Sequence, residues 1–110
     1  MTTPAFTQAQ FDGRLSIFLA HSQDLHDAWM NQIAPAQPKK RITVSVGRRF
    51  IAVWVAERYD ETVRSIYAFV DRGNGDLYMP KSWRGPAPRV RGNLFEPDNG
   101  FHAMGPHGVS

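Results

Sequence analysis

The fold is decided by residues 63–79, VRSIYAFVDRGNGDLYM, which contain the clearest turn signal in the chain. Asn74-Gly75 lies between two segments of high β propensity, and both turn residues tolerate a positive φ angle. Residues 63–71 and 76–79 are therefore predicted to form an antiparallel hairpin. Strict alternation along the first strand gives two apolar faces, with Ile66, Ala68 and Val70 on one face and Tyr67 and Phe69 on the other.

The segments before this hairpin are also predicted to be strands. From Arg41 to Val46, apolar and polar residues alternate, which indicates a strand with one apolar face. Gly47 and the two arginines after it mark a turn or a bulge. Residues 50–57 are apolar on both faces and are expected at the centre of the sheet. With Pro80 ending the last strand, residues 41–80 are predicted to form a three- to four-stranded antiparallel meander.

Residues 7–33 are predicted to be helical. Thr7 to Gln10 has the pattern of a capping box, and Phe6 is placed to act as a hydrophobic staple. The first six residues are expected to form a loose arm. Ser22 interrupts the apolar stripe and is also a good N-cap residue, so a single helix and a helix pair remain alternatives. The stripe consists of Phe11, Leu15, Phe18, Leu25, Trp29 and Ile33.

Length and composition place these elements in one α+β domain spanning residues 1–110. No apolar run approaches the roughly 20 residues that a membrane helix needs, and no secretory signal is evident. There is no cysteine, which excludes disulfides and thiolate metal sites. We therefore expect a cytoplasmic protein without a membrane partner.

The charges are distributed unevenly along the chain. Residues 1–38 contain one basic and three acidic residues, and residues 39–110 contain twelve basic and seven acidic residues, which together give the net charge of +3. Only three of the basic residues are lysine. Arginine is suited to bidentate recognition of phosphate and to stacking, so the second half of the chain is expected to meet an anionic partner. A basic surface exposed only to solvent is the alternative.

Residues 81–110 are predicted to form an arginine-rich loop followed by an extended C-terminal arm. The segment contains four prolines and five glycines, which argue against long regular elements. Interspersed large apolar residues argue against disorder. The arm is expected to pack on its own sheet or on a neighbouring subunit. Together with the long helical stripe, it points to a homo-oligomer.

No catalytic signature is present, so an enzyme is not expected. The sequence lacks a nucleophile elbow, a phosphate-binding loop and a dinucleotide fingerprint. The four histidines lack zinc spacing, and His21 and His26 fall on different faces of a helix. We therefore expect neither a metal nor a cofactor.

The strongest candidate site is the segment Trp83–Asn93, WRGPAPRVRGN. Three arginines lie on a loop that two prolines stiffen, and a preformed loop loses less entropy on binding. Arginines, aromatic rings and free amides together suit a nucleotide-sized anion. The alternative is a structural loop with Trp83 in the core and the arginines paired to acids.

Residues 65–94 resemble a recurring pattern in small bacteriophage proteins. The matching pieces are Tyr67-Ala68-Phe69-Val70-Asp71, Asn74-Gly75-Asp76-Leu77-Tyr78, Ser82-Trp83, Pro86-Ala87 and Arg91-Gly92-Asn93. Met79 departs from the pattern, which has lysine there. The arrangement is similar to the Thoeris anti-defence sponge proteins, which have N-terminal helices, an antiparallel sheet and a C-terminal hook.

The resemblance implies a homo-oligomer that binds cyclic ADP-ribose isomers and holds them without cleaving them. It implies Phe69, Asn74 and Arg91 as ligand-binding residues, with Arg84 and Arg89 nearby. Taken with the basic segment, the predicted site comprises Phe69, Asn74, Trp83, Arg84, Arg89, Arg91 and Asn93.

Three functions remain open at this point. The first is a phage sponge that sequesters a nucleotide immune signal. The second is nucleic-acid binding through the basic sheet and loop, which predicts an affinity that falls steeply with salt. The third is an inhibitor or adaptor that binds a host protein through the apolar C-terminal arm.

Overall fold

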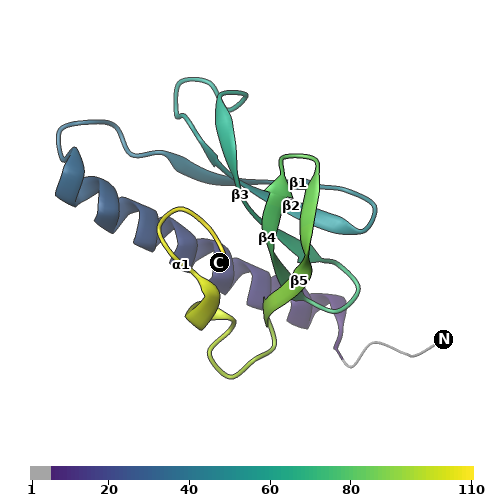
Figure 1. Ribbon diagram of the computed structural model, residues 1–110. Helices are drawn as coiled ribbons and strands as arrows, with labels where there is room; N and C mark the ends of the chain where they lie inside the picture. The colour runs from purple at the N-terminus through teal and green to yellow at the C-terminus, as the bar shows by residue number, and fades with distance from the viewer. Residues whose placement is uncertain (1–5) are drawn as a thin grey trace.

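The computed structural model describes residues 6–110 and has a helix packed on one face of a sheet (Figure 1). The elements are α1 (Gln8–Ile33), β1 (Arg41–Val46), β2 (Phe50–Ala56), β3 (Arg64–Asp71), β4 (Asp76–Ser82), β5 (Gly85–Asn93) and a 3-10 turn, Phe101–Ala103. The strands form an antiparallel meander in the order β1-β2-β3-β4-β5. The α+β class is confirmed, with five strands instead of the three to four expected.

The capping box starts a single, unbroken helix. The Gln10 amide donates to Thr7 Oγ1 at 3.1 Å, and the Thr7 amide donates to Gln10 Oε1 at 2.8 Å. Phe6 stacks on Phe11 with ring centroids 5.8 Å apart, as a hydrophobic staple should. Residues 1–5 of the expected loose arm lie outside the described residues. Ser22 does not break the helix, because its hydroxyl donates back to the Leu19 carbonyl at 2.7 Å instead of capping a new turn.

The apolar stripe of α1 differs from the prediction in its second half. The buried positions are Phe11, Phe18, Ser22, His26 and Met30. Leu25 and Trp29 are only half-buried, and Ile33 is 57% exposed. The buried face of the second half of α1 also meets the C-terminal segment, for example where His26 contacts Pro106. Sequence periodicity alone could not reveal these contacts.

A β-bulge in β3 changes which side chains face the helix. Trp54 of β2 pairs with Ile66, while the preceding residue, Val53, pairs with Ala68, so Tyr67 is the extra residue. Tyr67 therefore joins Ala68 in the helix-side core, and Ile66 packs on the opposite side with Phe69. The prediction that placed Ile66 with Ala68, and Tyr67 with Phe69, is wrong for this reason.

The sheet continues beyond Pro80, contrary to the sequence prediction. β4 runs to Ser82, and β5 then occupies nine residues that were expected to be a loop. Prolines are tolerated in β5 because it is an edge strand and need not donate on its outer side. Pro80 and Pro86 face each other, and the β4–β5 register shifts at three points. β4 and β5 therefore form a hairpin with irregular pairing.

The segment 94–110 packs on α1 and β3 of the same chain. It consists mainly of turns, with one 3-10 turn, so it is not the extended arm that was predicted. Arg14 and Asn99 exchange hydrogen bonds of 3.1 and 2.9 Å, and the Phe101 ring stacks on His21 with centroids 3.8 Å apart. These contacts engage apolar residues that had been considered for a neighbouring subunit or a host protein.

Tyr67 attaches the end of the chain to the core. Its side chain is fully buried, and its hydroxyl donates to the Gly105 carbonyl at 2.6 Å. Burial raises the pKa of Tyr67 to about 12, so the hydroxyl keeps its proton across the physiological range. The Val109 amide also donates to the Tyr67 carbonyl at 3.3 Å. No helix within residues 6–110 is both long and apolar enough to cross a membrane.

We expect Tyr67→Phe to destabilise the protein by about 1–3 kcal/mol, because the Gly105 carbonyl loses its donor inside the structure. Urea unfolding followed by circular dichroism measures the change. Tyr59→Phe is the matched control, since Tyr59 is 79% exposed. Equal unfolding midpoints for the two variants would show that the Tyr67 hydroxyl does not secure the C-terminal segment.

Candidate functional site

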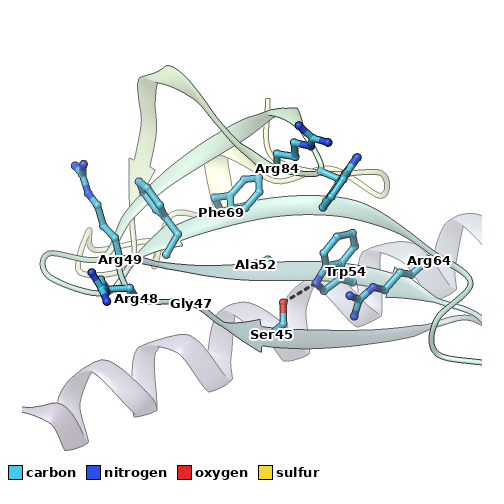
Figure 2. A pocket seen from close by; sticks show the side chains of 11 residues that line it. Ser45, Gly47, Arg48, Arg49, Ala52, Trp54, Arg64, Phe69 and Arg84 are labelled. Atoms are coloured by element: carbon cyan, nitrogen blue, oxygen red, sulfur yellow. Dashed lines mark hydrogen bonds between the residues drawn. The ribbon is translucent and has the colours of Figure 1, made fainter.

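A hollow of about 600 Å³ lies on the sheet face opposite α1 (Figure 2). We call it the sheet hollow. Its lining comes from β1, the β1–β2 turn, β2, β3 and the β4–β5 turn. The lining residues are Ser45, Gly47, Arg48, Arg49, Phe50, Ala52, Trp54, Arg64, Phe69, Trp83 and Arg84.

The order of side-chain sizes along β2 creates the sheet hollow. Residues two apart on a strand share a face, so Phe50, Ala52 and Trp54 point to the same side. Ala52 lies opposite Ser45 on β1 and opposite Phe69 on β3. Because Ala52 and Ser45 are small, the space above them stays open between the larger rings.

The floor of the sheet hollow is aromatic and held in place. Trp54 and Phe69 are almost fully buried, although no helix covers this face. The Trp54 indole N–H donates to Ser45 Oγ at 2.9 Å, which fixes the ring orientation (Figure 2). Phe50 meets Phe69 edge-on, with centroids 6.2 Å apart. These contacts present a rigid apolar base to anything bound above it.

Two arginines stand on the β1–β2 turn at one end of the sheet hollow (Figure 2). Arg72, from the β3–β4 turn, holds this turn from behind: its guanidinium donates to the Gly47 carbonyl at 2.8 Å, and its amide donates to the Arg49 carbonyl at 2.9 Å. Arg49 Nε lies 3.4 Å from Asp71 Oδ2, whereas Arg48 has no carboxylate within 4.0 Å among the described residues. These bonds fix the backbone of the turn at Arg48, whose positive charge has no carboxylate partner among the described residues.

Two further arginines approach from other strands. The Arg64 guanidinium lies 3.9 Å from the centroid of the Trp54 ring, and that of Arg84 lies 5.1 Å from the centroid of Trp83. Within residues 6–110, neither arginine has a carboxylate within 4.0 Å. Trp83 is 63% exposed, so its ring is available to a ligand.

This arrangement has a defined chemical capacity. Four guanidinium groups border the sheet hollow, and none of its lining residues is acidic. Guanidinium groups bind phosphate oxygens in a bidentate manner and stack on aromatic rings. Exposed aromatic rings accept planar bases by stacking. The sheet hollow is thus suited to a ligand that combines anionic oxygens with a flat ring.

Three of the seven residues predicted from sequence line the sheet hollow: Phe69, Trp83 and Arg84. Asn74 and Asn93 instead stabilise the end of the hairpin. The Asn93 amide group donates to the Asn74 carbonyl and to Asp76 Oδ1, each at 2.9 Å. These two asparagines therefore have a clear structural role.

Arg89 and Arg91 do not converge with Arg84, contrary to the sequence prediction. They lie on β5, and a strand rises about 3.3 Å per residue, so they are carried roughly 15–25 Å from the β4–β5 turn. Arg89 is exposed. Arg91 is partly buried, and its Nε has no hydrogen-bond partner in the described structure. A loop would have gathered the three guanidinium groups, but a strand separates them.

The sequence prediction missed Arg48, Arg49, Arg64 and Trp54. Two signals pointed toward them. Residues 50–57 are apolar on both faces, yet a single helix can cover only one face of a small sheet. The two arginines after Gly47 mark a turn, and a turn at a sheet end can project charge over the uncovered face.

A second cluster of ionisable side chains follows β5. Ligand-type atoms of Glu96, Asp98 and His102 lie within 4.8 Å of one another. Asp98 accepts from the amides of Gly100 and His102 and lies 2.7 Å from His102 Nδ1. These hydrogen bonds explain the cluster as a stabilised turn, so the geometry gives no independent reason to place a cation there.

Comparison with known proteins finds one family. A model of a family of unknown function, DUF7717, matches residues 10–105. No curated protein and no solved structure matches the chain. The resemblance to sponge proteins therefore stays an expectation from the sequence.

We expect the Asp98–His102 pair to contribute stability in a limited pH range. The hydrogen bond that His102 donates to the Asp98 carboxylate raises the pKa of His102 above 6.5, and the same bond lowers the pKa of Asp98 below 3.8. Because its pKa is raised, His102 stabilises the fold below about pH 6.5, and this stabilisation is lost as pH rises through the pKa of the folded state. Because its pKa is lowered, Asp98 stabilises the fold above about pH 3.8, and this stabilisation is lost as pH falls through the pKa of the folded state.

An NMR titration of the His102 imidazole tests this pair. Asp98→Asn should bring the pKa of His102 back toward 6.5. In urea unfolding, His102→Ala should lower the stability more at pH 5.5 than at pH 8.5. An unchanged His102 titration in Asp98→Asn would mean that the hydrogen bond does not form in solution.

Proposed function

Because the chain belongs to DUF7717, a family of unknown function, we propose its role from the site itself: the protein binds a phosphorylated nucleotide in the sheet hollow and sequesters it without cleaving it. The observation that carries the proposal is the presence of four guanidinium groups around a fixed aromatic floor with no lining carboxylate. Three of the four lack an acidic partner among residues 6–110.

The position of the groups supports binding of phosphate and base together. Arg48 and Arg49 border one end of the sheet hollow, and Arg64 lies at the other end beside Trp54 (Figure 2). Phosphate oxygens are recognised by arginine forks, and a base stacks on a ring or on a guanidinium plane. A ligand with both parts satisfies more of this surface than an inorganic anion or an apolar molecule would.

The sponge resemblance directs the choice of ligand. Cyclic ADP-ribose isomers and cyclic oligonucleotides carry two or more phosphates and at least one base, which matches the distribution of arginines. In this proposal the protein is a phage anti-defence factor acting in the cytoplasm of an infected bacterium. Sequestration requires that the ligand be recovered intact, which mass spectrometry of heat-released material tests.

Arginines at the sheet hollow should control affinity, whereas an arginine elsewhere should not. We expect Arg64→Ala and Arg84→Ala each to weaken binding of cyclic ADP-ribose about tenfold. A stacking contact with a base contributes about 1–3 kcal/mol, and a charge-assisted hydrogen bond contributes about 1.5–3 kcal/mol. Arg89→Ala removes the same charge from an exposed position on β5 and serves as the matched control. Calorimetry measures all three, and an equal loss for Arg89→Ala would indicate only non-specific attraction.

A single-stranded nucleic acid is the second candidate, because the sheet hollow lies on an uncovered face where a chain can enter and leave. Aromatic side chains beside a basic groove are typical of such binding. This candidate predicts that affinity rises with oligonucleotide length and falls steeply with salt. If a small cyclic nucleotide binds at least as tightly as a long oligonucleotide, the result supports the first candidate.

Filling the sheet hollow should separate the two candidates. Ala52→Leu adds bulk above the floor and leaves the net charge unchanged. We expect it to reduce binding of a small nucleotide by tenfold or more, while oligonucleotide binding, which uses arginines along the whole face, falls much less. A variant that keeps its thermal unfolding midpoint and still binds the small nucleotide as well as the parent would exclude the sheet hollow as its site.

A further inference from the structure

The two edges of the sheet are built differently. The outer edge of β5 contains Pro86 and Pro88, and its pairing with β4 shifts register at three points. Prolines, charges and bulges at an edge hinder the addition of another strand. The exposed Arg89 adds a charge to the same strand. β5 therefore has several of the features that keep natural sheets from joining edge to edge.

The edge formed by β1 has none of these features between Ile42 and Val46. The sequence ITVSV contains no charge, proline or glycine, and every residue pairs with β2 in continuous register. Val44 is 41% exposed and Val46 is 64% exposed. An exposed, regular and β-branched edge strand is a template for a further strand.

The hydrogen-bonding groups on this edge can be assigned. The Gly47 amide donates to the Phe50 carbonyl of β2, so it points inward. Because main-chain groups alternate in direction along a strand, those of Ile42, Val44 and Val46 point outward. The Ile42 amide confirms this, since it donates to the Gln23 side-chain oxygen at 2.8 Å.

Gln23 also defines where the free edge begins. Its side-chain nitrogen donates to the Lys40 carbonyl at 2.8 Å, so α1 occupies the first outward groups of this edge. No residue from 6 to 110 bonds the outward main-chain groups of Val44 or Val46. The free edge is thus short and centred on Val44.

We propose that β1 pairs antiparallel with β1 of a second copy of this chain, about a two-fold axis through Val44. The pattern of this strand is its own complement. Apolar residues at 42, 44 and 46 would face 46, 44 and 42 of the partner, and the hydroxyl residues Thr43 and Ser45 would face each other. The outer Ile42–Val46 pairs would contribute mainly side-chain contacts, because Gln23 already accepts from the Ile42 amide. A two-fold interface requires such self-complementarity, which an unrelated strand would have no reason to match.

The geometry at the axis permits the pairing. The outward amide and carbonyl of Val44 would exchange two hydrogen bonds with the same groups of the partner. Lys40, which would approach the partner's Arg48, already has a counter-ion in Glu57 at 3.3 Å. The contact is small, so the dimer should depend on concentration.

The dimer places both copies of the sheet hollow on one face. The sheets become continuous across the two β1 strands, with a helix layer on the opposite face. Ser45 lines the sheet hollow and lies on β1, so each hollow adjoins the new interface. The pairing itself does not depend on the proposed ligand and is tested without one.

Sedimentation velocity over a range of concentrations tests the pairing. We expect the wild-type mass to rise from 12.4 kDa toward twice that value. Val44→Lys places two like charges opposite each other at the axis and should hold the protein as a monomer. Val90→Lys makes the same change on β5, at a residue 45% exposed, and should dimerise like the wild type.

A register-specific cross-link tests the pairing independently of whether the lysine variant folds. The chain has no cysteine, so a mixture of Thr43→Cys and Ser45→Cys chains contains only the two introduced thiols. Residues 43 and 45 would form a non-hydrogen-bonded pair across the axis, which brings their Cβ atoms close enough for a disulfide. We expect a mixed disulfide on mild oxidation, with each variant alone forming far less.

Three results would overturn the proposal. The first is a wild-type mass that stays at 12.4 kDa up to about millimolar concentration. The second is dissociation of the dimer by Val90→Lys and not by Val44→Lys. The third is equal cross-linking in the mixture and in the single variants.

Discussion

β2 and β3 carry apolar side chains on both faces of the sheet, yet the single helix covers only one face, and the rest of the structure follows from this constraint. Hydrophobic residues left in water forgo about 25 cal/mol for each Å² of apolar surface. α1 covers one face. The other face buries Ala52, Trp54 and Phe69 against neighbouring apolar side chains, and the Arg64 guanidinium lies over the Trp54 ring. This solution leaves guanidinium groups at the surface above an apolar floor.

The helix face is completed by the end of the chain, which acts as a second covering element. Tyr67 is the link, because the bulge in β3 turns its ring toward α1 and its hydroxyl toward Gly105. The segment then meets His26, whose Nδ1 lies 2.9 Å from the Pro106 carbonyl. Sheet, helix and C-terminal segment therefore depend on one another, while the opposite face remains free to carry a site.

The sequence predicted what local chemistry determines. The capping box, the Asn74-Gly75 hairpin and the first three strands depend on neighbouring residues and were found. It failed where distant contacts decide. Proline-rich β5 forms because β4 offers a pairing edge, and the bulge at Tyr67 exchanges the faces of two residues. The same limit explains the site: Trp83 and Arg84 were identified, but Arg48 and Arg64 approach from strands whose neighbours no local pattern reveals.

In the proposed nucleotide complex, Arg64 determines how a base would enter the sheet hollow. Its guanidinium lies 3.9 Å from the centroid of Trp54, so the Trp54 ring is already covered on that face. A base would have to displace this cation from the ring, or stack on its outer surface, as planar guanidinium groups allow. Stacking on the outer surface keeps the cation–π contact and places the positive charge beside the phosphates. It also needs no movement of the floor, since Trp54 stays bonded to Ser45. In the proposed complex, Arg64 would thus serve better as a platform for the base than as a group that the ligand must expel.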